Sequence, residues 1–390
     1  MIQADRRAFA KALELAGAAV TRHRYAIPVL QTLKISAIGR LRIEGSDLST
    51  MTCAEIDYEG DPTESFALCA PAKVRAAVNH AGGDRVTLEQ QEKTARVACG
   101  KLDAAIATFP ADDHPGAPRI SQERFGVDMG AAELRALARI RPAISTEETR
   151  YYLNGVCVRN IGNWLYRFIA TDGHRLMIHD VPLPGAEGDL PDNIIIPRAF
   201  IDMMLARFGK SREPVRFSFG GAALWNTPET DLAPENSGAL HLAVRGELGK
   251  VSFAIASKPI DGTFPDVQRV IPKETKHHVE IDRAALVQAI QSLHSLGEGK
   301  TRALKFTAEP AGLRIAASHP DFGEATYDVA ASHNLPADYL IGFNGQYFLD
   351  CCNALSGETV RLELNCAASP SVIRDPADTA FFSVLMPMRV

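Results

Sequence analysis

Long apolar runs are absent from the sequence. None of its 390 residues belongs to a stretch near the roughly 18 uninterrupted apolar residues that a membrane-spanning helix needs. The first residues are charged and amphipathic, and they lack the apolar centre and small-residue cleavage site of a secretory signal. We therefore expect a cytoplasmic protein that does not associate with membranes.

Cysteine is scarce, and its spacing does not indicate disulfide or metal chemistry. The seven cysteines include no C-x-x-C pair, and Cys351 and Cys352 are adjacent within a segment of helical periodicity. We expect all seven to be reduced residues of the core. His277 and His278 adjoin without the spacing of metal ligands. The sequence predicts neither a bound metal nor a cofactor.

Motifs of catalysis are also missing. Residues 299–301 read GKT, but a phosphate-binding loop requires a glycine five positions before Gly299, where the chain has His294. Asp172 and His174 could form a catalytic pair, but no nucleophile with a supporting motif accompanies them. Because Asp-Gly is common in hairpin turns, we interpret this string as a structural turn. A hydrolase built on the pair is the least favoured alternative.

One pattern of helical segments occurs three times along the chain. In each copy a first segment opens with an aspartate that can cap a helix, and it carries apolar residues at three- and four-residue spacing. A second segment follows in each copy and ends at a glycine, where a helix C-cap is expected. The sequence therefore predicts six amphipathic helices. The first segments span 5–20, 128–144 and 282–296, and the second segments span 71–83, 197–209 and 344–357.

Each second segment is followed by a strand-like run in which apolar residues alternate, namely RVTLEQ, PVRFSF and TVRLEL. The valines Val86, Val215 and Val360 of these runs are 129 and 145 residues apart, close to a third of the 390-residue chain. Repeats of this length are whole domains, because solenoid units have about 20–50 residues. We predict an α+β fold of three tandem domains, each with two helices packed on antiparallel sheet. The predicted domains are 1–120, 121–272 and 273–390.

Positive charge is concentrated in the helical segments, although the chain carries a formal net charge of −5. The six segments, counted with their flanking residues, sum to +8 and leave −13 for the remainder. Segment 282–296 is neutral, and segment 343–357 carries −1. This separation of charge is what a protein ring that encircles DNA would need. Its positive helices would face the phosphates, and its acidic exterior would discourage binding elsewhere. Lysine and arginine also favour solvated helix faces, so the count alone leaves both interpretations open.

Four short strings together resemble the beta sliding clamp family, the processivity subunits of bacterial DNA polymerase III. They are YYLNG (151–155), ATDGHRL (170–176), FPDVQRVIP (264–272) and VLMPMRV (384–390), and they occur in the family's order along the whole chain. The resemblance implies crescent-shaped subunits that dimerise head to tail into a closed ring around duplex DNA. It also implies a non-catalytic protein, because ATP hydrolysis during loading belongs to a separate clamp loader.

The resemblance further implies three sites. One is a pocket that binds short linear peptides of the replicative polymerase, the clamp loader and repair proteins. Its expected residues are Leu153, Thr171, Gly173, His174, Arg175, Leu176, Pro265, Val270, Val384, Met386, Pro387, Met388 and Arg389. The expected DNA contacts are Arg24, Lys73, Tyr151 and Tyr152, with Arg198 added on grounds of charge. Closure of the homodimer is expected to join the first domain near Ile106 to the third near Leu296.

The sequence departs from the family at three places. The family's FPDYRRV reads FPDVQRV here, so positions 267 and 268 lack an aromatic and a cation. The helical segments of the third unit lack basic character, and a coil-like insert at 224–239 lengthens the middle unit. These departures leave open a clamp-like adaptor or decoy, which would bind the same peptides without encircling DNA.

Overall fold

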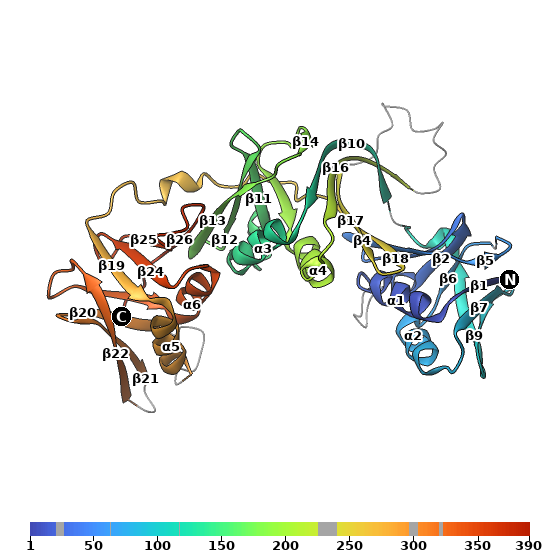
Figure 1. Ribbon diagram of the computed structural model, residues 1–390, viewed down its shortest axis with the longest axis horizontal. Coiled ribbons are helices and arrows are strands. Elements are labelled where there is room, and N and C mark those ends of the chain that lie inside the picture. The colour runs from blue at the N-terminus through green and yellow to red at the C-terminus, as the bar shows by residue number, and fades with distance from the viewer. Residues whose placement is uncertain (21–26, 63, 117, 225–239, 296–302, 320–322) are drawn as a thin grey trace. The chain divides into compact units, whose positions relative to one another are not determined.

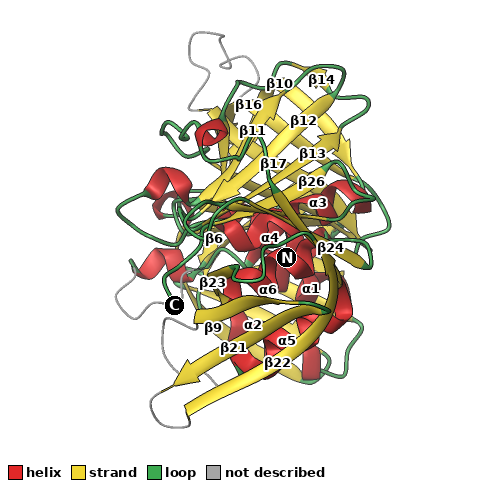
Figure 2. Ribbon diagram, turned by 90° about the vertical axis from the view of Figure 1, so that its left-hand side faces the viewer, coloured by secondary structure: helices red, strands yellow, loops and turns green. Residues whose placement is uncertain are grey.

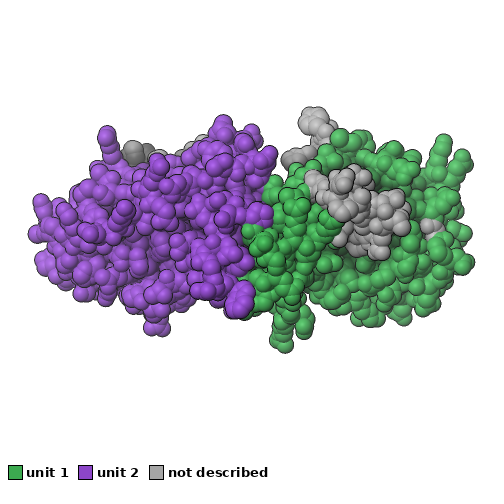
Figure 3. Space-filling view, turned by 90° about the horizontal axis from the view of Figure 1, so that it is seen from above, with its two compact units in different colours: residues 1–134, 183–190, 199–259 green, residues 135–182, 191–198, 260–390 purple. Residues whose placement is uncertain are grey.

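The computed structural model describes residues 1–20, 27–62, 64–116, 118–224, 240–295, 303–319 and 323–390. They form two compact units (Figure 3). Each unit is built on one large antiparallel sheet. Unit 1 comprises residues 1–134, 183–190 and 199–259, and unit 2 comprises residues 135–182, 191–198 and 260–390. The middle third of the chain thus contributes to both units. Mixed helix and antiparallel sheet confirm the predicted α+β class.

The sheet of unit 1 has 14 strands in the order β14-β10-β16-β17-β18-β4-β3-β2-β6-β9-β8-β7-β1-β5. Its strands are β1 (Ile2–Asp5), β2 (Leu33–Ile38), β3 (Arg40–Ser46), β4 (Thr50–Ile56), β5 (Glu59–Gly60), β6 (Phe66–Leu68), β7 (Arg85–Gln90), β8 (Thr94–Cys99), β9 (Leu102–Pro110), β10 (Pro118–Met129), β14 (Glu187–Gly188), β16 (Val215–Leu224), β17 (Leu240–Leu248) and β18 (Val251–Ser257). The unit also contains α1 (Arg6–Ala16), α2 (Pro71–His80) and nearly all of α4 (Arg198–Phe208).

The sheet of unit 2 has 12 strands in the order β15-β11-β12-β13-β26-β25-β24-β19-β22-β21-β20-β23. Its strands are β11 (Gly155–Asn160), β12 (Leu165–Thr171), β13 (Arg175–Pro182), β15 (Ile194–Pro197), β19 (His277–Asp282), β20 (Ala303–Glu309), β21 (Gly312–His319), β22 (Gly323–His333), β23 (Leu340–Asn344), β24 (Thr359–Leu364), β25 (Ser371–Arg374) and β26 (Phe381–Leu385). It contains most of α3 (Ala131–Ile140), with α5 (Arg283–His294) and α6 (Gly345–Ala354). Strands dominate both units (Figure 2).

All six predicted helices are present, and two of the predicted aspartate caps are confirmed. The Asp5 carboxylate accepts the Ala8 N–H, and the Asp282 carboxylate accepts the Ala285 N–H, both at 2.8 Å. Helix α1 lies beside α2, and α5 lies beside α6 (Figure 1). The apolar stripe of α1 packs on β3, β4 and β18, which leaves its other face to charged residues. No helix among the described residues is long and apolar enough to cross a membrane.

The predicted cap at Asp128 is wrong. Strand β10 continues through Met129, because it pairs with β16 along this stretch, and α3 begins only after Gly130. Asp128 is therefore a strand residue. The start of α3 is capped instead by Glu133, whose Oε2 accepts the Gly130 N–H at 2.7 Å.

The predicted glycine caps of α2 and α6 are also wrong. The C-cap residues of these helices are Ala81 and Leu355, and both have extended backbone. After α6, Gly357 serves close packing, because a Cβ there would collide with the carboxylate of Asp375. Glycine at this position therefore provides space for a neighbouring side chain rather than a left-handed helix end.

The cysteine prediction holds for most of the seven thiols. All are free, five are buried, and Cys69 is half-buried. Cys366 is exposed in the turn between β24 and β25, so the expectation that every cysteine belongs to the core is wrong there.

Candidate functional site

A cavity of about 280 Å³ opens in unit 2 beside the C-terminal segment. The end of β12, the start of β13 and a 3-10 helix, Tyr151–Leu153, form part of its wall. Buried apolar residues behind the cavity, among them Leu153, Leu176 and Val384, belong to one core cluster, so this wall is fixed. The cavity is lined by Arg150, Tyr152, Leu153, Thr171, Gly173, Arg175, Leu176, Pro265, Asp266, Val267, Val270, Val384 and Met386.

Nine of the thirteen residues expected in the partner pocket line this cavity. The other four are His174, Pro387, Met388 and Arg389, which lie next to it along the same two segments. The carbonyl of His174 accepts the Met386 N–H at 2.9 Å, so the C-terminal segment is bonded to the turn before β13. The His174 ring stacks on Tyr347 of α6 with 5.9 Å between centroids. Pro387 and Met388 are half-buried, and Arg389 is exposed.

The string TDGHR forms a tight turn that is bonded to itself. Asp172 Oδ1 accepts the N–H groups of His174 and Arg175 at 2.9 and 3.0 Å. The Thr171 hydroxyl donates to the Arg175 carbonyl at 2.7 Å. Gly173 has φ +88°, and a Cβ there would also meet the guanidinium of Arg150. The Asp172 carboxylate is thus engaged by the main chain and Arg175, as a structural turn requires.

Arg175 places a fixed positive charge in the pocket wall. Its side chain is only 8% exposed, and it donates to Asp172 at 3.0 Å, to the carboxylate of Asp350 and to the carbonyl of Pro142. Its guanidinium carbon lies 4.4 Å from the ring centre of Tyr347. Burial acts to lower the pKa of Arg175, but Asp350 and Asp172 outweigh it and hold the pKa above its ordinary value. Because these partners bind the guanidinium so completely, its orientation is set before any ligand arrives.

Four lining residues were not predicted for the pocket: Arg150, Tyr152, Asp266 and Val267. Val267 replaces the family's aromatic residue, yet its side chain is 4% exposed and belongs to the core cluster behind the cavity. Asp266 caps the short 3-10 helix Val267–Arg269 by accepting the Gln268 N–H at 3.1 Å. An Asp placed before such a turn is a recognisable capping pattern, and this pattern in the sequence could have indicated the turn at Asp266.

The expected DNA contacts occupy different places in the two units. Lys73 is exposed on α2 of unit 1. Tyr151 is 53% exposed and Tyr152 half-buried, with an edge-to-face ring contact of 5.8 Å. They lie in the 3-10 helix Tyr151–Leu153. Arg198 is half-buried and donates to the carbonyl of Ile144 at 2.9 Å. Arg24 is outside the described residues.

Charged side chains surround α1 in unit 1. Glu14 binds Lys11 at 3.0 Å, Arg207 of α4 at 3.2 Å and Arg75 of α2 at 3.5 Å. Burial acts to raise the pKa of Glu14, but Lys11, Arg207 and Arg75 outweigh it and hold the pKa below its ordinary value. This carboxylate thus joins three helices whose cations outnumber it. A cavity of about 630 Å³ beside the cluster also contains Lys73.

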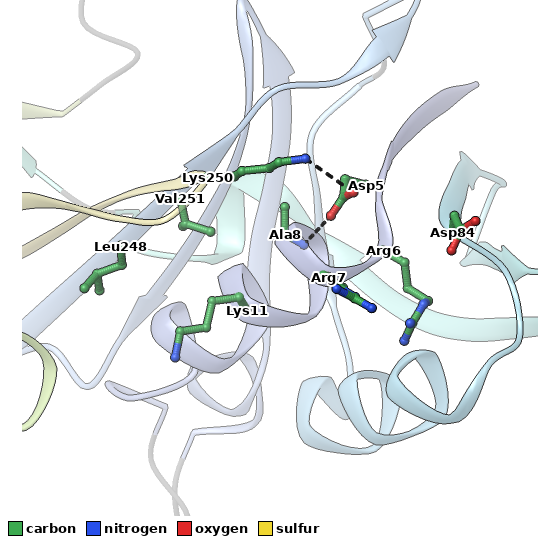
Figure 4. Close-up of a pocket in the computed structure, with 9 residues that line it drawn as sticks. All are labelled: Asp5, Arg6, Arg7, Ala8, Lys11, Asp84, Leu248, Lys250 and Val251. Atoms are coloured by element: carbon green, nitrogen blue, oxygen red, sulfur yellow. Dashed lines mark hydrogen bonds and ion pairs between the residues drawn. The ribbon is translucent and has the colours of Figure 1, made fainter.

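A third cavity, of about 450 Å³, lies at the first turn of α1 (Figure 4). Arg7 and Lys11 of the helix line it together with Lys250 from the β17–β18 turn, whose Nζ is 3.8 Å from Asp5. Positive side chains therefore flank α1 along much of its length. Such a face suits the sequence-independent binding of phosphate groups.

Ile106, expected at the dimer interface, is half-buried on β9. Over residues 102–107 this strand pairs with β8, and it pairs with β6 only at 108–110. Among the described strands, β9 therefore keeps one unpaired edge beside Ile106. In unit 2, β22 has the same arrangement, since 323–330 pairs with β21 and only 331–333 with β19. Leu296 lies outside the described residues.

Antiparallel sheets, basic helix faces and an apolar pocket beside the C-terminal segment are together the features of a DNA sliding clamp. Sequence models of the DNA polymerase III beta subunit match the chain, the central domain at 131–266 and the C-terminal domain at 268–389. The beta sliding clamp of Caulobacter vibrioides is 30% identical over 400 aligned residues, covering 99% of each chain. That of Escherichia coli K12 is 28% identical over 371, covering 94% of each.

Solved structures agree with these relatives. Caulobacter crescentus pol III beta matches with a TM-score of 0.85 at 29% identity, covering 100% of both chains. A DnaN sliding clamp from Bartonella birtlesii, bound to griselimycin, matches with a TM-score of 0.84 at 28% identity, covering 100% of this chain and 99% of that one. The chain belongs to the beta sliding clamp family and has the function of a DNA sliding clamp for DNA polymerase III. The resemblance drawn from the four strings is confirmed.

Proposed function

We propose that two copies of this chain close head to tail into a ring that encircles duplex DNA and holds a polymerase on it without chemistry of its own. The observation that carries the proposal is the basic face of α1, α2 and α4 in a chain whose net charge is −5. Lysine and arginine bind phosphates regardless of sequence, so a ring lined by them slides along DNA. Acidic residues elsewhere limit binding to other surfaces.

Ring closure is supported by the unpaired strand edges of β9 and β22. An open edge presents free N–H and C=O groups, which a strand of another chain can satisfy. Pairing of β9 from one copy with β22 from the other would cover Ile106 and use a different surface on each partner. Such a heterologous contact closes into a ring when two copies complete it. Each subunit would contribute three domains, 1–120, 121–272 and 273–390.

The 280 Å³ cavity is the proposed docking site for short peptides of the replicative polymerase, the clamp loader and repair proteins. Apolar anchors of such peptides would contact Leu176 and Val384, while Arg175 offers a fixed cation at the wall. The flexible Met386 side chain suits a pocket with several ligands. The clamps of Bartonella birtlesii and Pseudomonas aeruginosa have been solved with griselimycin bound, and we expect this chain to bind it too.

The decisive test is retention on nicked circular DNA after treatment with the cognate clamp loader and ATP, which the loader hydrolyses. We expect the protein to stay on the circle at moderate salt and to leave when the DNA is linearised. We expect the same behaviour in the cytoplasm, and we expect the protein to need no metal or cofactor of its own. A dimer by sedimentation that never loads would favour the adaptor or decoy. A stable monomer would exclude the ring.

A further inference from the structure

The last five residues of the chain are held on unit 2 by two backbone hydrogen bonds. The Met386 N–H donates to the His174 carbonyl, and the Met388 N–H donates to the Gly342 carbonyl, both at 2.9 Å. Met386 itself lines the cavity and is 39% exposed. The two bonds flank this part of the wall, so its position depends on the residues that hold the segment 386–390.

Gly342 lies on β23, the last strand of the sheet, and faces the C-terminal segment. Its backbone is not in the left-handed region, so its torsion angles do not require glycine. Space does. A Cβ at this position would meet a methyl carbon of Val390 and lie 2.5 Å from the Met388 carbonyl oxygen. The side chain of Val390 therefore rests directly over the bare backbone of Gly342, although Val390 is 54% exposed.

We propose that Gly342 and Val390 are positioning residues for ligand binding, although neither lines the pocket. Val390 seats on Gly342, this contact keeps the Met388 bridge to β23 in place, and the bridge holds Met386 at the cavity wall. The inference rests on the proposed function of the pocket and adds to it a contact outside the pocket that controls ligand binding. Any change that unseats Val390 lowers the population of chains whose pocket is complete.

The effect on affinity follows from that population. When only a fraction of molecules has the binding-competent wall, the apparent dissociation constant rises by the inverse of the fraction. Gly342→Ala places a methyl group against both Val390 and the Met388 carbonyl. If it leaves about a tenth of the molecules with a seated segment, ligand binding weakens about tenfold. Val390→Ala removes the seated side chain but leaves the bridge, and we expect a smaller loss of about threefold.

The test is calorimetric titration of the full-length protein with griselimycin. Four proteins form a cycle: the native chain, Gly342→Ala, a deletion of residues 387–390, which keeps Met386 in the cavity wall, and both changes together. Gly342→Ala should weaken binding in the intact chain and add nothing in the shortened one, because the two changes act through one segment. Gly82→Ala is the control, since a Cβ there meets nothing within 4 Å. Native affinity in Gly342→Ala, or an equal loss in the shortened chain, would overturn the proposal.

Hydrogen exchange at the C-terminal residues separates this inference from the function of the pocket. Without any ligand, the Met388 amide should exchange faster in Gly342→Ala than in the native chain or in Gly82→Ala. Unchanged exchange would refute the anchoring by Gly342. If the exchange differs as expected but the native chain does not bind griselimycin, the anchoring stands and the proposed role of the pocket falls.

Discussion

The helix pair of the first repeat and that of the third share a fold but differ in the charge that they present. Helices α1 and α5 begin with the same aspartate cap and the same 2.8 Å bond. Around α1 the exposed or half-buried side chains include Arg7, Lys11 and, on its neighbour α2, Lys73. The exposed face of α5 instead carries neutral side chains such as Gln288, Gln291 and Ser292.

Two charged residues of the third repeat's helices, Arg283 and Asp350, are bound to other parts of the protein. Arg283 of α5 donates to the carbonyl of Gly357 at 2.6 Å. Asp350 of α6 accepts from Arg175 and from Gln346. Caps and apolar stripes fix the helices in both repeats, whereas the solvated face is free to vary. If two copies close into the proposed ring, DNA contact need not be shared equally among the repeats, because the closed ring itself keeps the protein on DNA.

The largest effect is expected from neutralising the basic face of the first repeat. Arg7→Gln with Lys73→Gln should weaken binding to linear duplex DNA about tenfold and reduce the salt dependence by roughly two phosphate contacts. Gln288→Glu with Gln291→Glu changes the net charge by the same amount on α5 and should do much less. Titration at several salt concentrations measures both, and equal losses would contradict the asymmetry between repeats.

A smaller effect in the opposite direction is expected from adding charge to the third repeat. Gln288→Lys with Gln291→Lys should strengthen binding to linear DNA about threefold and steepen its salt dependence. The same titration checks it. No gain would mean that α5 does not face the phosphates, and the difference between repeats would then have no bearing on DNA.

A still smaller gain is expected from Glu14→Gln. This change releases Lys11, Arg75 and Arg207 from their shared carboxylate, so DNA affinity should rise about twofold. Because Glu14 has a lowered pKa in the folded protein, its contribution to stability is present above its ordinary pKa of 4.5 and is lost as pH falls below it. Urea unfolding should therefore show a smaller loss of stability on acidification in the variant. An identical pH dependence would exclude Glu14 as the ionic centre.

No effect on DNA, but one on acid stability, is expected at His114 of unit 1. Burial, and then the charge of Lys34, lower the pKa of His114 to about 4 from 6.5. Between these values the unfolded chain binds a proton that the folded chain refuses, so stability falls as pH falls from 6.5 to about 4. His114→Gln cannot titrate and should show a shallower loss of unfolding free energy between pH 7 and pH 5. A parallel loss would show that His114 does not contribute.

Local rules predicted much of the fold. Helix positions and the caps at Asp5 and Asp282 depend on neighbours a few residues away, and both were correct. Asp128 failed because pairing of β10 with β16 extends the strand past it, and no local pattern announces a partner some 90 residues distant.

The residues of the pocket also fall into those that the sequence predicted and those that it did not. Its motif residues were found because they stand in short strings with a family likeness. Arg150 and Val267 line the same cavity from turns, where the direction of a side chain depends on the surrounding tertiary structure. Val267 shows the difference best, because its sequence position indicated a lost aromatic and the structure shows a buried aliphatic core residue.

The sheet of unit 1 also bears on how the chain is made. Strand β4 pairs with β18 from Thr50–Ser257 to Glu55–Ser252. During synthesis, one edge of β4 therefore has no partner until roughly 200 further residues have been added. At ribosomal rates of about 5–20 residues per second, that wait lasts roughly 10–40 s. During this time the emerging first third presents an open strand edge, which is a template for unwanted pairing. Nascent chains of this protein therefore expose this edge of β4 until the middle third has been synthesised.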